Sequence, residues 1–162
     1  MPVAAPIAIA AASYSQNTDS LTKGFEGLAP EEWLRSPSEK SNHLSWVVGH
    51  IIWARAAVAG MLGSPISKPW FPLVARGSKI ADPAEYPSSA ELSLALQEVT
   101  AVLNTAMENA SEEVLAGSAP ERIPTVDGKL SGTVSFLAWH DTFHVGQAAY
   151  LRSWLGHSGV HE

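Results

Sequence analysis

Residues 136–154 read FLAWHDTFHVGQAAYLRSW, and this stretch decides the fold. One set of its residues recurs at spacings of three and four, which places the set on a single face of an α-helix. The members of this stripe are Leu137, His140, His144, Gln147, Leu151 and Trp154. A core-facing imidazole or amide without a partner costs on the order of a few kcal/mol. Three such groups in the middle of one stripe therefore need a shared partner.

Residues 42–62 carry a comparable stripe that contains a further histidine. Its members follow spacings of four and three and are His43, Val47, His50, Ala54, Ala57 and Met61. The pattern predicts that His50 faces inward, midway along a second helix. Gly49 and Ala54 lie beside it and are small, which leaves room for another helix to approach closely.

These histidines predict a metal site. His140 and His144 are four residues apart on one helical face, a spacing that lets two imidazoles bind one ion. His50 from a facing helix would complete a three-nitrogen set, and three protein ligands leave a coordination position open, as in catalytic zinc sites. The alternative is that each histidine is an ordinary core residue with its own hydrogen bond. The chain has no cysteine, which excludes disulfides, thiolate ligands and cysteine nucleophiles and leaves nitrogen and oxygen as metal ligands.

The rest of the chain predicts an all-α fold. Breaks rich in proline and glycine separate four helical segments, at about residues 5–25, 42–62, 89–115 and 133–155. Ser41 or Asn42 is the expected N-cap of the second segment and Ser88 or Ser89 that of the third. The third segment has one apolar stripe, made of Leu92, Leu96, Val99, Leu103, Ala106 and Ala110.

The connections define the topology. Residues 65–87 contain five prolines and are too long for a tight antiparallel turn, so we interpret them as a crossover or a lid. Trp70, Phe71 and Arg76 in this segment could roof the site and select a substrate, or equally plug the core. Residues 117–132 form a second loop, in which a short hairpin is possible. The sequence therefore predicts one domain over residues 1–162, a four-helix bundle with a long crossover between the second and third helices.

Composition narrows the class of protein. The 162 residues are 46% hydrophobic and 16% charged, with a net charge of −6 and ten scattered Lys and Arg residues. This distribution disfavours nucleic-acid binding and a basic membrane-surface helix, and no stretch looks both long and apolar enough to cross a bilayer. Residues 3–12 are apolar like the core of a signal peptide, but no Lys or Arg precedes them and Pro6 interrupts them. We therefore expect a cytoplasmic protein.

Several polar residues near the predicted site have two interpretations. His43 could line a pocket, but a histidine at a helix start is more often a capping or surface residue. Gln147 could hydrogen-bond a ligand of the metal, or it could join two helices. His157 and His161 lie in the C-terminal tail, where we expect them to be solvated.

A second stripe on the last helix is aromatic. It consists of Phe136, Trp139, Phe143, Gly146 and Tyr150, which makes this helix apolar nearly all round. Such a helix should be covered on more than one side. A second copy of the chain could provide the cover, and so could the proline-rich loop.

The run from His140 to Gln147 resembles the HxxxHxGQ signature of the DinB/YfiT-like superfamily, and Asn42, Trp46 and the run Gly49-His50-Ile51 resemble its second-helix motif. The resemblance implies a four-helix bundle, often a homodimer, with zinc, nickel or a similar ion bound by His50, His140 and His144. Many members have Glu where Asp141 stands. Asp141 is one carbon shorter and about 100° around the helix from His140, so we assign it no role as a base or as support for a ligand.

The resemblance also bears on function. The superfamily includes transferases and isomerases that use low-molecular-weight thiols, beside many members without an assigned activity. It implies a metalloenzyme acting on a small molecule, as a thiol-dependent transferase or a hydrolase, in which the ion lowers the pKa of a bound water or thiol. The alternatives are a non-catalytic metal-binding stress-response module and a helical interaction protein whose histidines bind no metal. A serine triad is not indicated, because Ser135 has no positioned base near it in the pattern.

Overall fold

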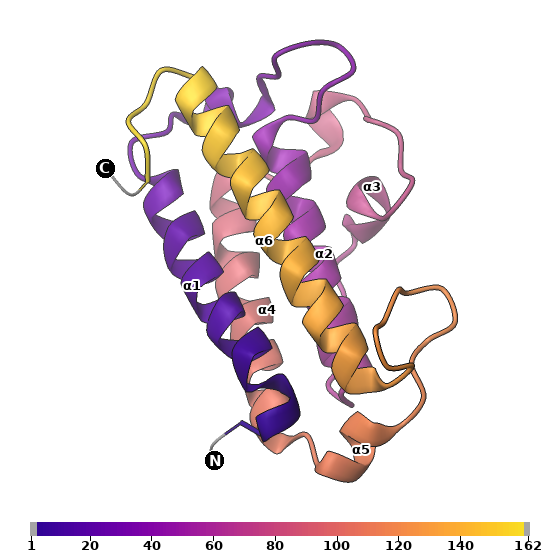
Figure 1. The fold of residues 1–162 in the computed structure, drawn as a ribbon. Coiled ribbons are helices and arrows are strands. Elements are labelled where there is room, and N and C mark those ends of the chain that lie inside the picture. Colours follow the sequence, from indigo (N-terminus) through magenta and orange to yellow (C-terminus); the bar gives the residue numbers. More distant parts are fainter. Residues whose placement is uncertain (1–2, 161–162) are drawn as a thin grey trace.

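The computed structural model describes residues 3–160, and its long elements are four helices packed side by side (Figure 1). These are α1 (Ala8–Phe25), α2 (Leu44–Met61), α4 (Ser89–Asn109) and α6 (Leu130–Trp154). The short elements are α3 (Phe71–Val74), α5 (Glu112–Ala116) and the 3-10 turns η1 (Ala5–Ile7), η2 (Pro30–Leu34) and η3 (Pro83–Glu85). No strand occurs within residues 3–160, where a single isolated bridge joins Ser118 to Lys129. The predicted all-α bundle is confirmed.

The predicted crossover is also present. Figure 1 shows that α1 and α6 run in one direction along the bundle, while α2 and α4 run in the other. The chain between α2 and α4 therefore returns along the length of the bundle before the next helix starts. Its one short helix, α3, packs against α2.

Some helix boundaries differ from the prediction. The third predicted helix is interrupted after Asn109, because Ser111 starts a new helix by accepting a hydrogen bond from the N–H of Val114. The last helix begins at Leu130, three residues earlier than expected. Ser88 caps α4 as predicted, in a reciprocal pair of bonds with Glu91.

The N-cap of α2 is His43 and not Ser41 or Asn42. Its Nδ1 accepts a hydrogen bond from the N–H of Trp46 at 3.1 Å. The ring is buried and packs edge-on against Tyr86, with ring centroids 4.6 Å apart. The Nδ1 atom therefore supplies the acceptor that the side chain of a serine or asparagine usually provides. Burial lowers the pKa of His43 below its ordinary value.

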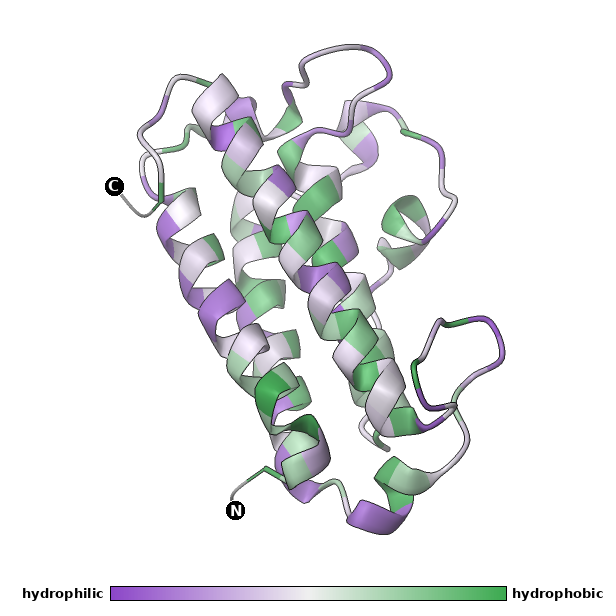
Figure 2. Cartoon of the chain, viewed as in Figure 1, coloured by the Kyte–Doolittle hydropathy of each residue, from purple (hydrophilic) through white to green (hydrophobic). Residues whose placement is uncertain are grey.

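The core consists of two hydrophobic clusters, one above the other along the bundle. One cluster includes Leu21, Ile51, Val99 and Leu151, and we call it the upper cluster because it lies toward the C-terminal end of α1, which is the upper end in Figure 1. The lower cluster includes Tyr14, Val58, Leu103 and Val134. In Figure 2 hydrophilic residues interrupt the hydrophobic colouring partway along α1 and α6. The buried polar residues Asn17, Arg55, Thr100 and Asp141 lie between members of the two clusters along their helices, so a polar layer separates the clusters.

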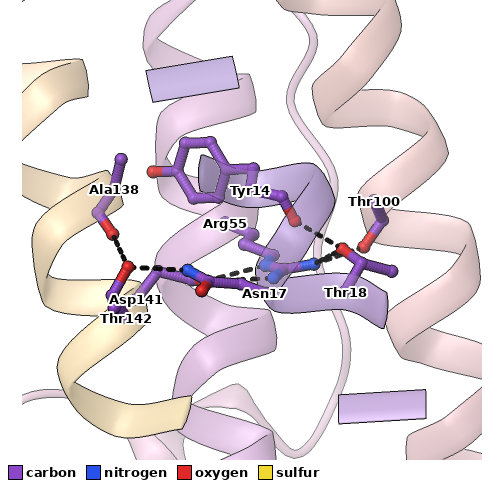
Figure 3. A network of polar contacts seen from close by, with 8 residues as sticks. All are labelled: Tyr14, Asn17, Thr18, Arg55, Thr100, Ala138, Asp141 and Thr142. Carbon is purple, nitrogen blue, oxygen red and sulfur yellow. Dashed lines mark hydrogen bonds and ion pairs between the residues drawn. The ribbon is translucent and has the colours of Figure 1, made fainter. Parts of the chain in front are cut away.

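A buried ion pair between Arg55 and Asp141 forms this layer (Figure 3). Their side chains are 0% and 1% exposed, and two N–H groups of Arg55 donate to the two oxygens of Asp141 at 2.8 and 2.9 Å. Arg55 Nη1 also donates to the hydroxyls of Thr18 and Thr100, at 2.8 and 2.7 Å. Asn17 donates to Asp141 at 2.9 Å. The network therefore joins all four long helices.

The ion pair corrects the predicted inward face of α6. The buried residues of this helix include Val134, Ala138, Asp141, Ala148 and Leu151, so Asp141 lies in the core stripe. Of the predicted stripe, His144 and Leu151 are buried as expected, whereas its end residue Trp154 is 39% exposed. A charged residue was not expected inside, but a fully paired one meets the condition for burial.

The aromatic stripe on α6 is largely uncovered. Trp139, Phe143 and Tyr150 are 61%, 53% and 64% exposed. The proline-rich loop packs on α2 through α3 and does not bury these rings. The hypothesis that the proline-rich loop covers this face is therefore wrong.

Two apolar segments belong to the bundle. Residues 3–12, which resembled a signal core, contribute Ile7 and Ala10 to the lower cluster. Among the described residues, one helix, Leu44–Met61, is long and apolar enough to cross a membrane. The sequence had predicted no such stretch. Since 78% of that helix is buried by its neighbours, it is the core helix of the bundle.

The ion pair predicts strong coupling between two substitutions. Replacing one partner, as in Arg55→Met or Asp141→Leu, should lower the free energy of unfolding by about 3–5 kcal/mol, because it leaves a buried charge unpaired. The double variant should lose much less than the sum of the two single losses. Urea unfolding of all four proteins measures this coupling. Additive losses would show that the pair does not act as a unit.

His43 predicts a pH dependence of stability. Because its pKa is lower in the folded chain, the unfolded chain takes up a proton first as the pH falls below the ordinary histidine value of about 6.5. The contribution of His43 is therefore intact above that pH and is lost below it. Urea midpoints at pH 7.5 and 5.5 should differ less in His43→Asn, which keeps a capping acceptor without a titrating ring. Equal pH dependence in both proteins would contradict this assignment.

Candidate metal centre

The three histidines of the sequence motif meet at one point in the structure. His50 comes from the middle of α2, while His140 and His144 come from successive turns of α6. The Nε2 atom of His140 lies 3.1 Å from that of His144 and 3.4 Å from that of His50. One ring nitrogen from each of the three lies within 4.8 Å of the others. The fold thus brings together all three predicted ligands.

These separations suit a shared metal ion. Two nitrogens bound about 2.0–2.1 Å from one ion at a tetrahedral angle lie about 3.4 Å apart. The observed 3.1 and 3.4 Å are close to that value. Three nitrogen donors without a thiolate suit zinc, nickel or another borderline divalent ion.

Two of the rings are oriented by groups outside the cluster. His50 Nδ1 donates to the backbone carbonyl of Val74 at 2.6 Å, and His144 Nδ1 donates to Oε1 of Gln147 at 2.8 Å. With the proton on Nδ1, the Nε2 lone pair is free to bind a metal. Of the two interpretations of Gln147, the hydrogen bond to a candidate ligand is the one observed. His140 Nδ1 is buried and has no hydrogen-bond partner within the described part of the chain.

Aromatic rings enclose the cluster. Trp46 stacks on His50, with centroids 4.8 Å apart and planes 8° from parallel, and Trp53 lies against the same imidazole at 5.2 Å. Phe143 meets His144 edge-on at 5.2 Å. The sequence did not single out Trp53, although its position three residues after His50 places it on the same side of α2.

Burial keeps the imidazoles neutral. It lowers the pKa of His50 to about 4, against the opposing effect of the Val74 carbonyl. Burial also lowers the pKa of His140 and of His144. A metal binds the neutral imidazole, so rings with lowered pKa values are ready to bind one at pH 7 without first losing a proton.

A pocket of about 310 Å³ opens beside the cluster. Its lining residues are His50, Trp53, Ala54, Ala57, Arg76, Ile123, Pro124, Phe136, Leu137 and His140. The pocket is therefore mostly apolar and lies between α2, α6 and the two long loops. Its volume falls in the range of small-molecule sites.

The proline-rich loop contributes to this region in two ways. Phe71 is buried in the upper cluster with Trp70 packed against it, so these two rings plug the core. Arg76 lines the pocket. Gly49 allows α3 to approach α2 closely, because a Cβ there would lie 2.8 Å from Val74. The small residue beside His50 thus makes room for the loop and not for another bundle helix.

The remaining histidines lie elsewhere. His43 caps α2 and is not one of the three clustered rings. His157 was expected to be solvated, but its Nε2 pairs with the carboxylate of Glu32 at 3.1 Å. His161 lies outside the described residues. Both carboxylate oxygens of Asp141 accept hydrogen bonds, from Arg55 and Asn17. This agrees with the prediction that Asp141 neither acts as a base nor supports a metal ligand.

Comparison with known proteins agrees with the geometry. The family model of the DinB superfamily matches residues 13–148. That range contains all three clustered histidines and Gln147. No curated protein matches the chain significantly. Because the family model covers most of the sequence, including the three-histidine cluster, the chain belongs to the DinB superfamily.

Proposed function

We propose that this chain is a metal-dependent enzyme that acts on a small molecule, in which His50, His140 and His144 hold one zinc or nickel ion. The convergence of three Nε2 atoms from two helices carries the proposal. The adjoining pocket supports catalysis over a purely structural ion, because His50 and His140 line it and a small molecule could reach the centre. We further propose that the protein works in the cytoplasm.

The activity that we propose is that of a thiol-dependent transferase or a hydrolase. A divalent ion in this centre would supply Lewis acidity, which lowers the pKa of a water or a low-molecular-weight thiol. The protein's own residues hold and shield the site: Val74 and Gln147 fix two imidazoles, while Trp46 and Trp53 exclude water from His50. A thiol substrate would bring the soft ligand that a chain without cysteine lacks.

One observation favours a second candidate, a non-catalytic metal-binding stress-response or interaction module. Apart from the two histidines, none of the residues that line the pocket is a usual general base. Asp141, the carboxylate next to His140, is turned into the core. Water exchange at the loaded centre separates the candidates, since an enzyme needs an open coordination position and a structural ion does not.

Metal binding provides the direct test. Chelator-treated protein should take up one zinc or nickel ion per chain in calorimetric titration. His144→Ala should lose most of this affinity while the helical signal persists at lower stability. Gln147→Ala, which only releases the His144 ring, should weaken binding by a smaller factor of about 10–100.

His157→Ala serves as the control, because it removes a histidine that pairs with Glu32 away from the centre. It should bind metal like the unmodified chain. Unchanged affinity in His144→Ala, or no uptake by the unmodified chain, would refute the metal centre and with it both candidate functions.

We also propose that the chain is a homodimer whose interface includes the aromatic stripe on α6. The ring centroids of Phe136 and Trp139 are 5.6 Å apart, and those of Trp139 and Phe143 are 6.1 Å apart. Exposed aromatic side chains that form a continuous patch are typical of interfaces. The stripe borders the proposed metal centre, because Phe143 touches His144 and Phe136 lines the pocket.

Sedimentation can test the dimer. The unmodified chain should sediment with twice the monomer mass, and Trp139→Glu should shift it to the monomer by placing a charge in an apolar interface. Leu94→Glu is a matched control, since Leu94 is 66% exposed but lies on α4. A monomeric unmodified chain, or a dimer that survives Trp139→Glu, would argue against this interface.

A further inference from the structure

The pocket beside the three histidines has an unusual charge distribution. Seven of its ten lining residues are apolar, two are His50 and His140, and the remaining one is Arg76. None of the carboxylates within residues 3–160 lines it. The pocket is therefore a mostly apolar cavity with one cationic side chain, that of the exposed residue Arg76.

The backbone holds Arg76 in place. Two residues before it, the carbonyl of Val74 accepts the 2.6 Å hydrogen bond from His50. Two residues after it, Ser78 Oγ accepts a hydrogen bond from Nε1 of Trp46 at 3.2 Å. Both anchors are bonded to residues of α2 at the proposed metal centre, so the loop carries Arg76 at a set position beside the centre.

A tight turn places Arg76 at the corner between these anchors. The N–H of Ser78 donates to the carbonyl of Ala75 at 3.0 Å, and Gly77 has a φ of 83°. This backbone conformation is strained for other residues and is typical of the third position of a type II turn. Arg76 occupies the second position, from which its side chain projects outward from the turn.

No ion pair in the described part of the chain includes Arg76. The ion pairs there join Arg55 to Asp141, Lys68 to Glu98 and His157 to Glu32. The hydrogen-bond donors of the guanidinium therefore remain available to a ligand.

We propose that this pocket binds a small organic acid, with its carboxylate on Arg76 and its hydrocarbon part against the apolar wall. A guanidinium matches a carboxylate with two parallel hydrogen bonds. The net charge of −6 gives the molecule as a whole no attraction for anions, so the local charge of Arg76 decides the preference. The inference rests on the proposed function in one respect, because the far end of the acid would lie at the three-histidine centre.

The test compares two probes of the same shape, hexanoate and its neutral analogue hexanamide. Their dissociation constants are measured by NMR titration on the protein as purified and after treatment with a chelator, since a carboxylate could also bind a metal directly. In both samples hexanoate should bind about tenfold more tightly than hexanamide, as expected of a charge-assisted pair. In Arg76→Gln the two constants should become equal.

Lys79→Gln is the matched control. It removes one positive charge from the same loop, but Lys79 does not line the pocket. The preference for hexanoate should survive this substitution. A preference that is absent in the unmodified chain, that persists in Arg76→Gln, or that is lost equally in Lys79→Gln would overturn the proposal.

Metal content, measured on the same samples, separates this inference from the proposed function. Preference for hexanoate in a chain that takes up no metal would support the acid-binding pocket and refute the enzyme. Metal uptake without that preference would leave the proposed function standing and overturn the role of Arg76.

Discussion

The buried ion pair between Arg55 and Asp141 is the interaction on which the rest of this structure depends. It lies between the two hydrophobic clusters and, through Thr18, Thr100 and Asn17, contacts every long helix. Two charges removed from water are tolerated only when their hydrogen-bonding groups find partners. Because the partners come from four helices, the condition is met in one arrangement of the bundle. Hydrophobic packing alone is less selective, since apolar surfaces can slide past one another.

That constraint also determines where the histidines point. Asp141 directly follows His140, so an inward Asp141 turns His140 about 100° away from the centre of the core. His140 is then half-buried and His144 buried against α2, where the imidazole of His50 meets them beside the pocket. A rotation of α6 would move the Nε2 atoms of His140 and His144 away from that of His50 and would break the bonds to Arg55 at the same time. The orientation of α6 therefore determines the geometry of both the buried ion pair and the candidate metal centre.

The crossover loop completes the site from the other side. Its short helix packs on α2 at Gly49, its Val74 carbonyl orients His50, and the following turn presents Arg76. The loop is therefore part of the centre's support and not a detached lid. The same segment plugs the upper cluster with Phe71, which couples the position of Arg76 to the packing of the core.

The sequence by itself determined the helical class, the crossover and the three histidines, because spacings of three and four report helix faces directly and prolines report their ends. It placed the inward face of α6 correctly for His144 and Leu151 but missed Asp141, since a hydrophobicity pattern favours burying Leu137 over a charged residue. Only the tertiary structure decided that Arg55 and Asp141 are core residues, that His43 caps α2 and that Arg76 lines the pocket. The physical reason is clearest for the ion pair. The value of a buried polar group depends on partners that are distant in the chain, 86 residues away for Arg55 and Asp141, and local periodicity carries no information about them.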